Sequence, residues 1–131
     1  MKNYILLTEK GLIVDNDLIE KTTPYSYINR LALSNFKTIT SITKATIKIT
    51  NKRYILPLYI SDRILLVQLS GIKSNDYFAF NYYSLKELFY SNDETTLLSF
   101  KDGTLLKVNI SKNRFESAFQ KLNLLLKNID Y

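Results

Sequence analysis

The sequence predicts a single α+β domain over residues 1–131, in which a long C-terminal helix packs on a mostly antiparallel sheet of about six or seven short strands. Three observations lead to this fold class. The length of 131 residues suits one domain, and a hydrophobic share of 46% provides for a sizeable core. Runs of β-branched and aromatic residues alternate with turn residues through most of the chain. Helical spacing of apolar side chains is clear only near the C-terminus.

The N-terminal segment predicts a hairpin followed by a loop. Residues 3–8 and 12–14 are apolar strands on either side of a turn at residues 9–11. Residues 15–29 are mixed in composition and contain Pro24. We therefore expect a loop over this range, with room for a short helix.

Residues 34–50 fit two interpretations. β-Branched residues dominate the segment, which favours a strand. The spacing favours a helix that ends near residue 47 and has Ser34 as its N-cap. Such a helix would gather Phe36, Ile39, Ile42 and Ile47 on one side and, on another side, Lys37, Lys44 and Lys48. We expect this helix, although a strand over residues 45–50 would also direct Lys48 away from the isoleucines.

The middle of the chain predicts a second hairpin and an aromatic strand. Residues 53–70 consist of two apolar runs around a turn, and Pro57, which has no backbone donor, marks an edge strand or a bulge. A polar loop follows, and residues 77–83 form an aromatic strand. Ser84 is expected to cap a short turn that extends to Leu88.

The C-terminal part predicts a third hairpin and the long helix. Residues 95–100 and 104–110 flank Asp102-Gly103, a strong signal for a tight hairpin turn. Asn113 and Glu116 then have the spacing of a capping box at the start of a helix. One apolar stripe follows at helical spacing, formed by Phe115, Ala118, Phe119, Leu122, Leu125, Leu126 and Ile129. We expect this stripe to pack on the sheet.

Positive charge is concentrated in one stretch of the chain. Eight of the eighteen Lys and Arg lie between Arg30 and Lys73, where Asp62 is the only acid. That stretch has a net charge of +7, whereas the whole chain carries +6. A basic composition without function would scatter its lysines, so the clustering favours a polyanionic partner, most simply DNA or RNA.

The residue types that are absent limit the chemistry. Without His and Cys, the usual nucleophile–base pairs and most zinc sites cannot be built, and the chain has no glycine-rich phosphate loop. We expect no enzyme, no catalytic residue, no metal, no cofactor and no small-molecule substrate. No apolar run approaches the ~18 residues of a membrane span, and the N-terminal apolar run is too short for a signal peptide. We therefore expect a cytoplasmic protein without a membrane partner.

Several short motifs occur in a characteristic order. They comprise a phenylalanine, a turn with Asp before Gly, an aliphatic strand, and an Ile-Ser-x-Asn-x-Phe segment that opens a helix, at Phe100, Gly103, Ile110, Ser111, Asn113 and Phe115. Upstream motifs are Pro57-Leu58-Tyr59-Ile60, Ser70, Phe80-Asn81-Tyr82 and Leu85. Together these residues resemble the ComK family of competence transcription factors over roughly residues 30–126. The family's Gly-Ser-Ser-Tyr-x-Gly-Arg segment aligns near residues 33–38, where its glycines and arginine are absent.

The resemblance implies a DNA-binding transcriptional activator of the genes for DNA uptake. It also implies recognition of A/T-rich half-sites, largely through the minor groove, by more than one subunit, and so a homo-oligomer. This agrees with the charge, because narrow A-tract minor grooves have an enhanced negative potential that attracts Lys and Arg. Discrimination in the minor groove is mainly between A·T and G·C pairs.

The basic stretch supplies the candidate DNA-binding residues, which are Lys37, Lys44, Lys48, Lys52, Arg53 and Arg63. The three lysines of the expected helix would contact phosphates, and Arg53 or Arg63 could enter a minor groove.

Two alternatives remain. Exposed Tyr77, Tyr82 and Tyr83 could stack on single-stranded bases. The chain could instead be a non-catalytic protein-interaction module, or a modulator of a full-length ComK that has lost DNA binding.

Overall fold

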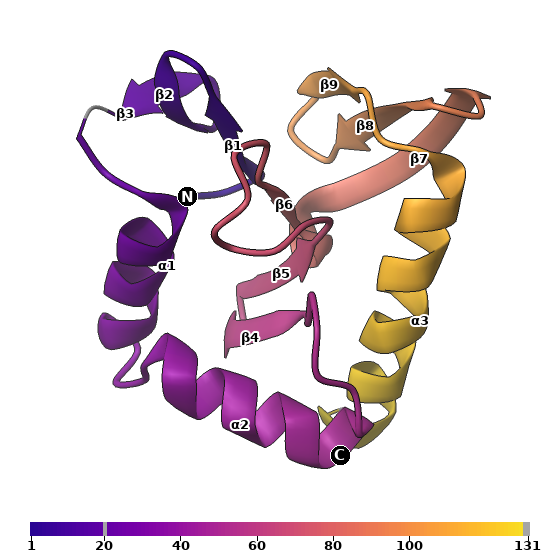
Figure 1. The fold of residues 1–131 in the computed structure, drawn as a ribbon. Coiled ribbons are helices and arrows are strands. Elements are labelled where there is room, and N and C mark those ends of the chain that lie inside the picture. The colour runs from indigo at the N-terminus through magenta and orange to yellow at the C-terminus, as the bar shows by residue number, and fades with distance from the viewer. Residues whose placement is uncertain (20, 130–131) are drawn as a thin grey trace.

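The computed structural model describes residues 1–19 and 21–129, which form an α+β fold of antiparallel strands and helices (Figure 1). The strands are β1 (Tyr4–Thr8), β2 (Gly11–Val14), β3 (Asp17–Ile19), β4 (Leu58–Ser61), β5 (Ile64–Gln68), β6 (Phe78–Asn81), β7 (Leu85–Asn92), β8 (Thr95–Phe100) and β9 (Leu105–Val108). The helices are α1 (Pro24–Leu33), α2 (Ile39–Thr50), α3 (Lys112–Ile129) and the short 3-10 helix η1 (Tyr82–Ser84). None of the helices described combines the length and the hydropathy that crossing a bilayer requires.

Two antiparallel sheets are formed. The larger has the strand order β3-β2-β1-β6-β5-β4, and the smaller has the order β7-β8-β9. In the larger sheet the first strand of the chain pairs with β6, so that Tyr4 lies opposite Phe80. Figure 1 shows α1 and α2 meeting at a corner, with α2 running below β4 and α3 descending from the smaller sheet.

Side chains of the larger sheet alternate between two cores. The first core, shared with α3 and the smaller sheet, includes Tyr4, Phe78, Phe80, Phe100 and Phe115. The second core, shared with α1 and α2, includes Ile5, Ile28, Ile42, Leu66 and Ala79. Because β6 and most of β5 are buried, their sequences are nearly continuous apolar runs without polar alternation.

The three predicted hairpins and the terminal helix are confirmed. β1–β2, β4–β5 and β8–β9 pair around the expected turns, and Pro57 directly precedes β4, an edge strand of the larger sheet. Gly103 has a φ of 92°, which a residue with a side chain rarely adopts, and its N–H donates to the carbonyl of Phe100. On α3 the predicted stripe buries Phe115, Ala118, Leu122 and Leu125.

The prediction for residues 15–29 is confirmed where it allowed a short helix, whereas the expected loop is shortened by a strand. β3 adds an edge strand beside β2, and α1 begins at Pro24. The Thr23 side chain accepts a hydrogen bond from the Ser26 N–H at 3.1 Å and so caps the helix. Proline suits the first turn, where its missing N–H has no helical partner in any case. The signal for the start of a helix was therefore present in the sequence as the pair Thr23-Pro24.

The helix expected from Ser34 begins later, at Ile39. Ser34 instead ends α1, and Phe36 has a positive φ of 60°, which breaks any continuous helix through this segment. Thr38 and Ser41 form a reciprocal capping box that fixes the new start. The helix continues to Thr50 rather than residue 47. The alternative of a strand over residues 45–50 is wrong.

Two smaller predictions also need correction. The turn expected from Ser84 to Leu88 is not formed; the 3-10 helix ends at Ser84 and β7 begins at once. β7 pairs with β8 along its length but is largely exposed, so its sequence lacks a strong apolar alternation. The last helix begins at Lys112, and Ser111 rather than Asn113 accepts the capping hydrogen bond, from the Arg114 N–H at 3.3 Å.

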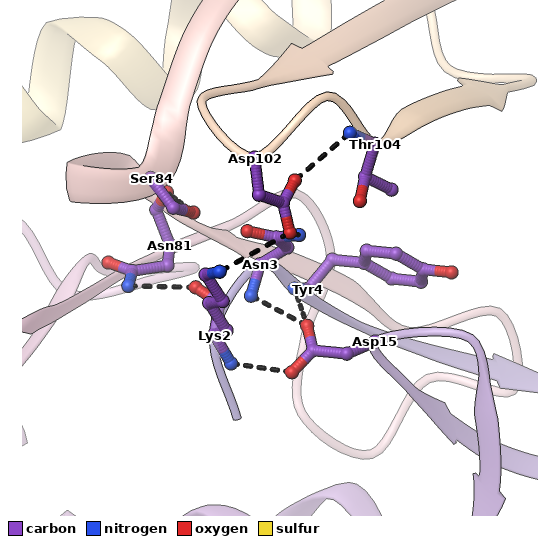
Figure 2. A network of polar contacts seen from close by, with 8 residues as sticks. All are labelled: Lys2, Asn3, Tyr4, Asp15, Asn81, Ser84, Asp102 and Thr104. Atoms are coloured by element: carbon purple, nitrogen blue, oxygen red, sulfur yellow. Dashed lines mark hydrogen bonds and ion pairs between the residues drawn. The ribbon is translucent and has the colours of Figure 1, made fainter.

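A polar network joins the two sheets near the N-terminus (Figure 2). Asp102, in the β8–β9 turn, accepts hydrogen bonds from the Asn3 amide at 3.0 Å and from the Thr104 N–H at 3.0 Å. The ammonium of Lys2 lies 3.6 Å from the same carboxylate. Asp15 accepts from the backbone N–H groups of Asn3 and Tyr4 at 2.6 and 3.0 Å. These contacts tie the smaller sheet to the first strand of the larger one.

Candidate nucleic-acid interface

Helix α2 presents two of the predicted lysines to solvent. Its buried face consists of Ile39, Ile42, Thr46 and Thr50, which lie one helical turn or less apart. The hydroxyls of Thr46 and Thr50 donate to helix carbonyls one turn earlier, at 2.8 Å each, so their burial leaves no unpaired donor. Lys44 and Lys48 are exposed on the opposite face, one turn apart.

Lys52 and Arg53 follow α2 in the connection to β4, which is exposed over residues 51–55. Asn51 ends the helix in the left-handed conformation, with a φ of 57°. The connection, residues 51–57, has no regular structure of its own, yet polar side chains of the body hold it. Gln68 donates to the carbonyl of Leu56 at 2.6 Å, and Lys121 of α3 donates to the carbonyl of Tyr54 at 2.6 Å.

Lys121 brings a further cation to this connection from the far end of the sequence. Its ammonium also reaches the carbonyl of Ile55 at 3.3 Å. Burial, and then the charge of nearby Lys52, lower the pKa of Lys121. The positive charges of Lys121 and Lys52 repel each other, and a bound anion would offset this repulsion. Lys121 was missed from the sequence because only the packing of α3 beside the connection brings it there.

Lys37 does not belong to the exposed face of α2. It lies in the turn between α1 and α2, is half-buried, and donates to the carbonyl of Ile60 at 3.1 Å. Its ammonium lies 4.9 Å from the centre of the Tyr59 ring. Lys37 therefore supports the contact of the turn with β4, and its charge is partly engaged within the protein.

Arg53 and Arg63 lie apart from each other. Arg53 borders a hollow with Ile39 and Thr43, on the flank of α2 away from Lys37. Arg63, in the β4–β5 turn, is exposed beside Asp62 and borders a different hollow, whose other lining residues come from the N-terminus, β5, β6 and η1 rather than from α2. Of the six predicted residues, Lys44 and Lys48 thus share the exposed face of α2, and Lys52 and Arg53 follow directly after the helix in the sequence.

No carboxylate within the described ranges 1–19 and 21–129 lies within ion-pairing distance of these cations; the ion pairs found there involve Lys2 and Lys112. The sequence explains this, since residues 21–61 contain no acid at all. We call the exposed side chains Lys44, Lys48, Lys52 and Arg53 the basic face. Its positive potential is not cancelled locally, which is the electrostatic requirement for binding a polyanion.

Aromatic stacking through the predicted tyrosines is not supported. Tyr77 is fully buried, and its hydroxyl donates to Gln68 at 2.7 Å. Tyr82 and Tyr83 are half-buried and pack against the first core. Exposed aromatic side chains flank α2 in the sequence: Phe36 lies in the turn before the helix and Tyr54 in the connection after it.

Comparisons of the chain with protein-family models, with curated proteins and with solved structures gave no match.

The structure also bears on metal binding. Among residues 1–19 and 21–129, no three acidic side chains come close enough to hold a metal ion together. The basic face itself offers three compact ammonium charges and one guanidinium.

Proposed function

We propose that this chain is a DNA-binding transcription factor of the ComK type, which binds A/T-rich duplex through its basic face and activates genes for DNA uptake. The observation that carries the proposal is that four cations on α2 and directly after it, Lys44, Lys48, Lys52 and Arg53, are exposed and without a carboxylate partner among the described residues. The order of sequence motifs shared with that family supports the regulatory role. A homo-oligomer follows from the same likeness, because paired half-sites call for paired subunits.

The spacing of the lysines suits a sugar-phosphate backbone. Lys44 and Lys48 are four residues apart, which is ~6 Å along the helix axis. Successive phosphates on one strand advance by ~3.4 Å along the duplex, so the two ammonium groups can contact neighbouring phosphates. Arg53 is the member of the basic face best suited to a minor groove, since narrow A/T-rich grooves attract arginine.

Charge reversal of α2 tests the proposal. We expect K44E/K48E to reduce affinity for an A/T-rich duplex strongly and to flatten the slope of log affinity against log salt by about 2, because two phosphate contacts are lost. The measurement is fluorescence anisotropy with A/T-rich and G/C-rich duplexes at several salt concentrations. Wild-type protein should prefer the A/T-rich duplex.

The matched control is K10E/K107E. Lys10 lies in the β1–β2 turn and Lys107 on β9; both are exposed, and their reversal changes the net charge by the same amount. If both double variants lose affinity equally, only overall charge matters and the basic face is not the site. If wild-type protein binds neither duplex but associates with a full-length ComK protein, the role is that of a modulator.

A further inference from the structure

Phe36 is the most exposed of the large apolar side chains described, with 99% of its surface accessible. It lies in the short turn between α1 and α2, at the corner of the fold where the two helices meet (Figure 1). Leu33, at the end of α1, is 54% exposed. The two side chains give this corner an apolar tip that the fold itself does not bury.

The backbone at Phe36 is unfavourable for a residue of its size. Its φ is 60°, in the left-handed region where glycine is usual and a bulky side chain is a rare outlier. The position is the cap that ends a helix: the N–H of Phe36 donates to Leu33 at 3.0 Å, and the N–H of Lys37 donates to Ala32 at 2.9 Å. With almost no contact to offset this strain, the phenylalanine lowers the stability of the fold.

The turn holds the ring on a rigid support. The side-chain amide of Asn35 donates to the carbonyl of Leu31 at 2.9 Å, and Asn29 accepts from the N–H of Ile39 at 3.1 Å. Lys37 fixes the other side of the turn to β4. An apolar side chain on an ordered backbone loses less conformational freedom on binding than one on a flexible loop, which favours insertion into a partner.

The surrounding charge selects the partner. Phe36 lies within residues 21–61, which carry seven cations and no acid. A second copy of the chain docking symmetrically on this corner would bring two such basic segments together, and like charges at an interface are unfavourable. A nucleic acid is negative outside and offers stacked apolar surfaces inside, so it matches both the charge and the ring.

We propose that Phe36 is a wedge that inserts from the minor groove between two base pairs and bends the duplex held by the basic face. This inference rests on the proposed function. Phenylalanine and leucine are among the side chains that unstack base steps in this way, and TA steps are the easiest to open. Thr38 and Lys44 are six residues apart, ~9 Å along the helix axis, or about three base-pair rises. The turn that carries Phe36 and the lysines of α2 are therefore close enough along the axis to reach one stretch of duplex.

The test is Phe36→Gly. Glycine removes the ring and relieves the strain at a positive φ, so we expect Tm to rise by about 3–6 °C. Affinity for an A/T-rich duplex with TA steps should fall about tenfold, since the contacts of the wedge are lost, while the salt slope stays unchanged because no phosphate contact is lost. The bend, measured by energy transfer between dyes at the duplex ends, should decrease.

Phe36→Leu is the companion variant and should retain most of the bending. A 2-aminopurine in place of one adenine should brighten when wild-type protein or F36L binds, because the base loses a stacking neighbour, but not when F36G binds. Sedimentation of the DNA-free variants shows whether self-association has changed.

The outcomes are distinguishable. If F36G binds and bends the duplex like wild type, Phe36 is no wedge, although the basic face stands. A shift of F36G to a smaller oligomer without DNA would make Phe36 a contact between subunits and overturn the wedge. If wild-type protein binds no duplex at all, the proposed function and the wedge both fall.

Discussion

Tyr77 shows how a single buried hydroxyl can fix a surface segment. Its side chain is fully buried, and burial raises the pKa of its phenol well above the usual range. The neutral hydroxyl donates to the Oε1 of Gln68 at 2.7 Å, and the Nε2 of Gln68 donates to the carbonyl of Leu56 at 2.6 Å. This relay orients the Gln68 amide and so helps to hold the connection that carries Lys52 and Arg53.

Removing that hydroxyl should destabilise the protein. In Tyr77→Phe the Gln68 oxygen stays buried without its donor, so we expect the free energy of unfolding to fall by about 1–3 kcal/mol. Urea denaturation followed by circular dichroism measures the change. Tyr25→Phe is the control, because Tyr25 lies exposed on α1 and its variant should stay within about 0.5 kcal/mol of wild type. Equal effects of the two variants would contradict the role of the relay.

At the scale of elements, local patterns predicted the hairpins and α3 because their signals are complete within the segment. The Asp102-Gly103 turn and the apolar stripe of the last helix need no distant contact to be recognised. β7 was missed because it is a largely exposed strand whose pairing with β8 is not visible in its own pattern. Whether such a segment forms a strand depends on its pairing with a neighbouring strand rather than on its own sequence.

The start of α2 decided which lysines belong together. A helix from Ser34 would have aligned Lys37 with Lys44 and Lys48, whereas the left-handed residue Phe36 leaves Lys37 in the turn. Left-handed backbone at a bulky residue runs against intrinsic preference, so propensity could not have predicted it. The cations of this region were predictable in part: Lys44 and Lys48 of the basic face follow from periodicity, whereas tertiary packing brings Lys121 near Lys52.

The residue 51–57 connection should depend on Lys121 for its position. In Lys121→Met the hydrogen bonds to Tyr54 and Ile55 are lost while the length of the side chain is kept. We expect faster amide hydrogen exchange in the connection and a loss of roughly three- to tenfold in affinity for the A/T-rich duplex, about 0.7–1.4 kcal/mol. Lys127→Met removes the same charge from an exposed position on α3 and should change neither measurement. Faster exchange in both variants would contradict a positioning role.

On the scale of the whole molecule, charge is separated along the fold. Most of the acids described lie on or between the strands β1–β3 and β7–β9, whereas α2 and the C-terminal half of α3 carry lysines without acids (Figure 1). Sequence revealed the basic stretch but not this separation, because the lysines of α3 join it only when the chain folds. An uneven charge of this kind orients the molecule toward a polyanion as it approaches.

We expect the network of Figure 2 to make the stability of the fold depend on pH. The Thr104 N–H, the Asn3 amide and the charge of Lys2 hold the pKa of Asp102 well below its usual range. A carboxylate with a lower pKa in the folded than in the unfolded state stabilises the fold above its unfolded pKa of ~3.9, and this contribution is lost as the pH falls toward the folded value.

Asp102→Asn should therefore lose less stability than wild type between pH 6 and pH 2. Urea midpoints at a series of pH values measure this, with Asp93→Asn, in the β7–β8 turn, as the control that should follow wild type. Parallel curves for wild type and Asp102→Asn would mean that the carboxylate does not couple the two sheets.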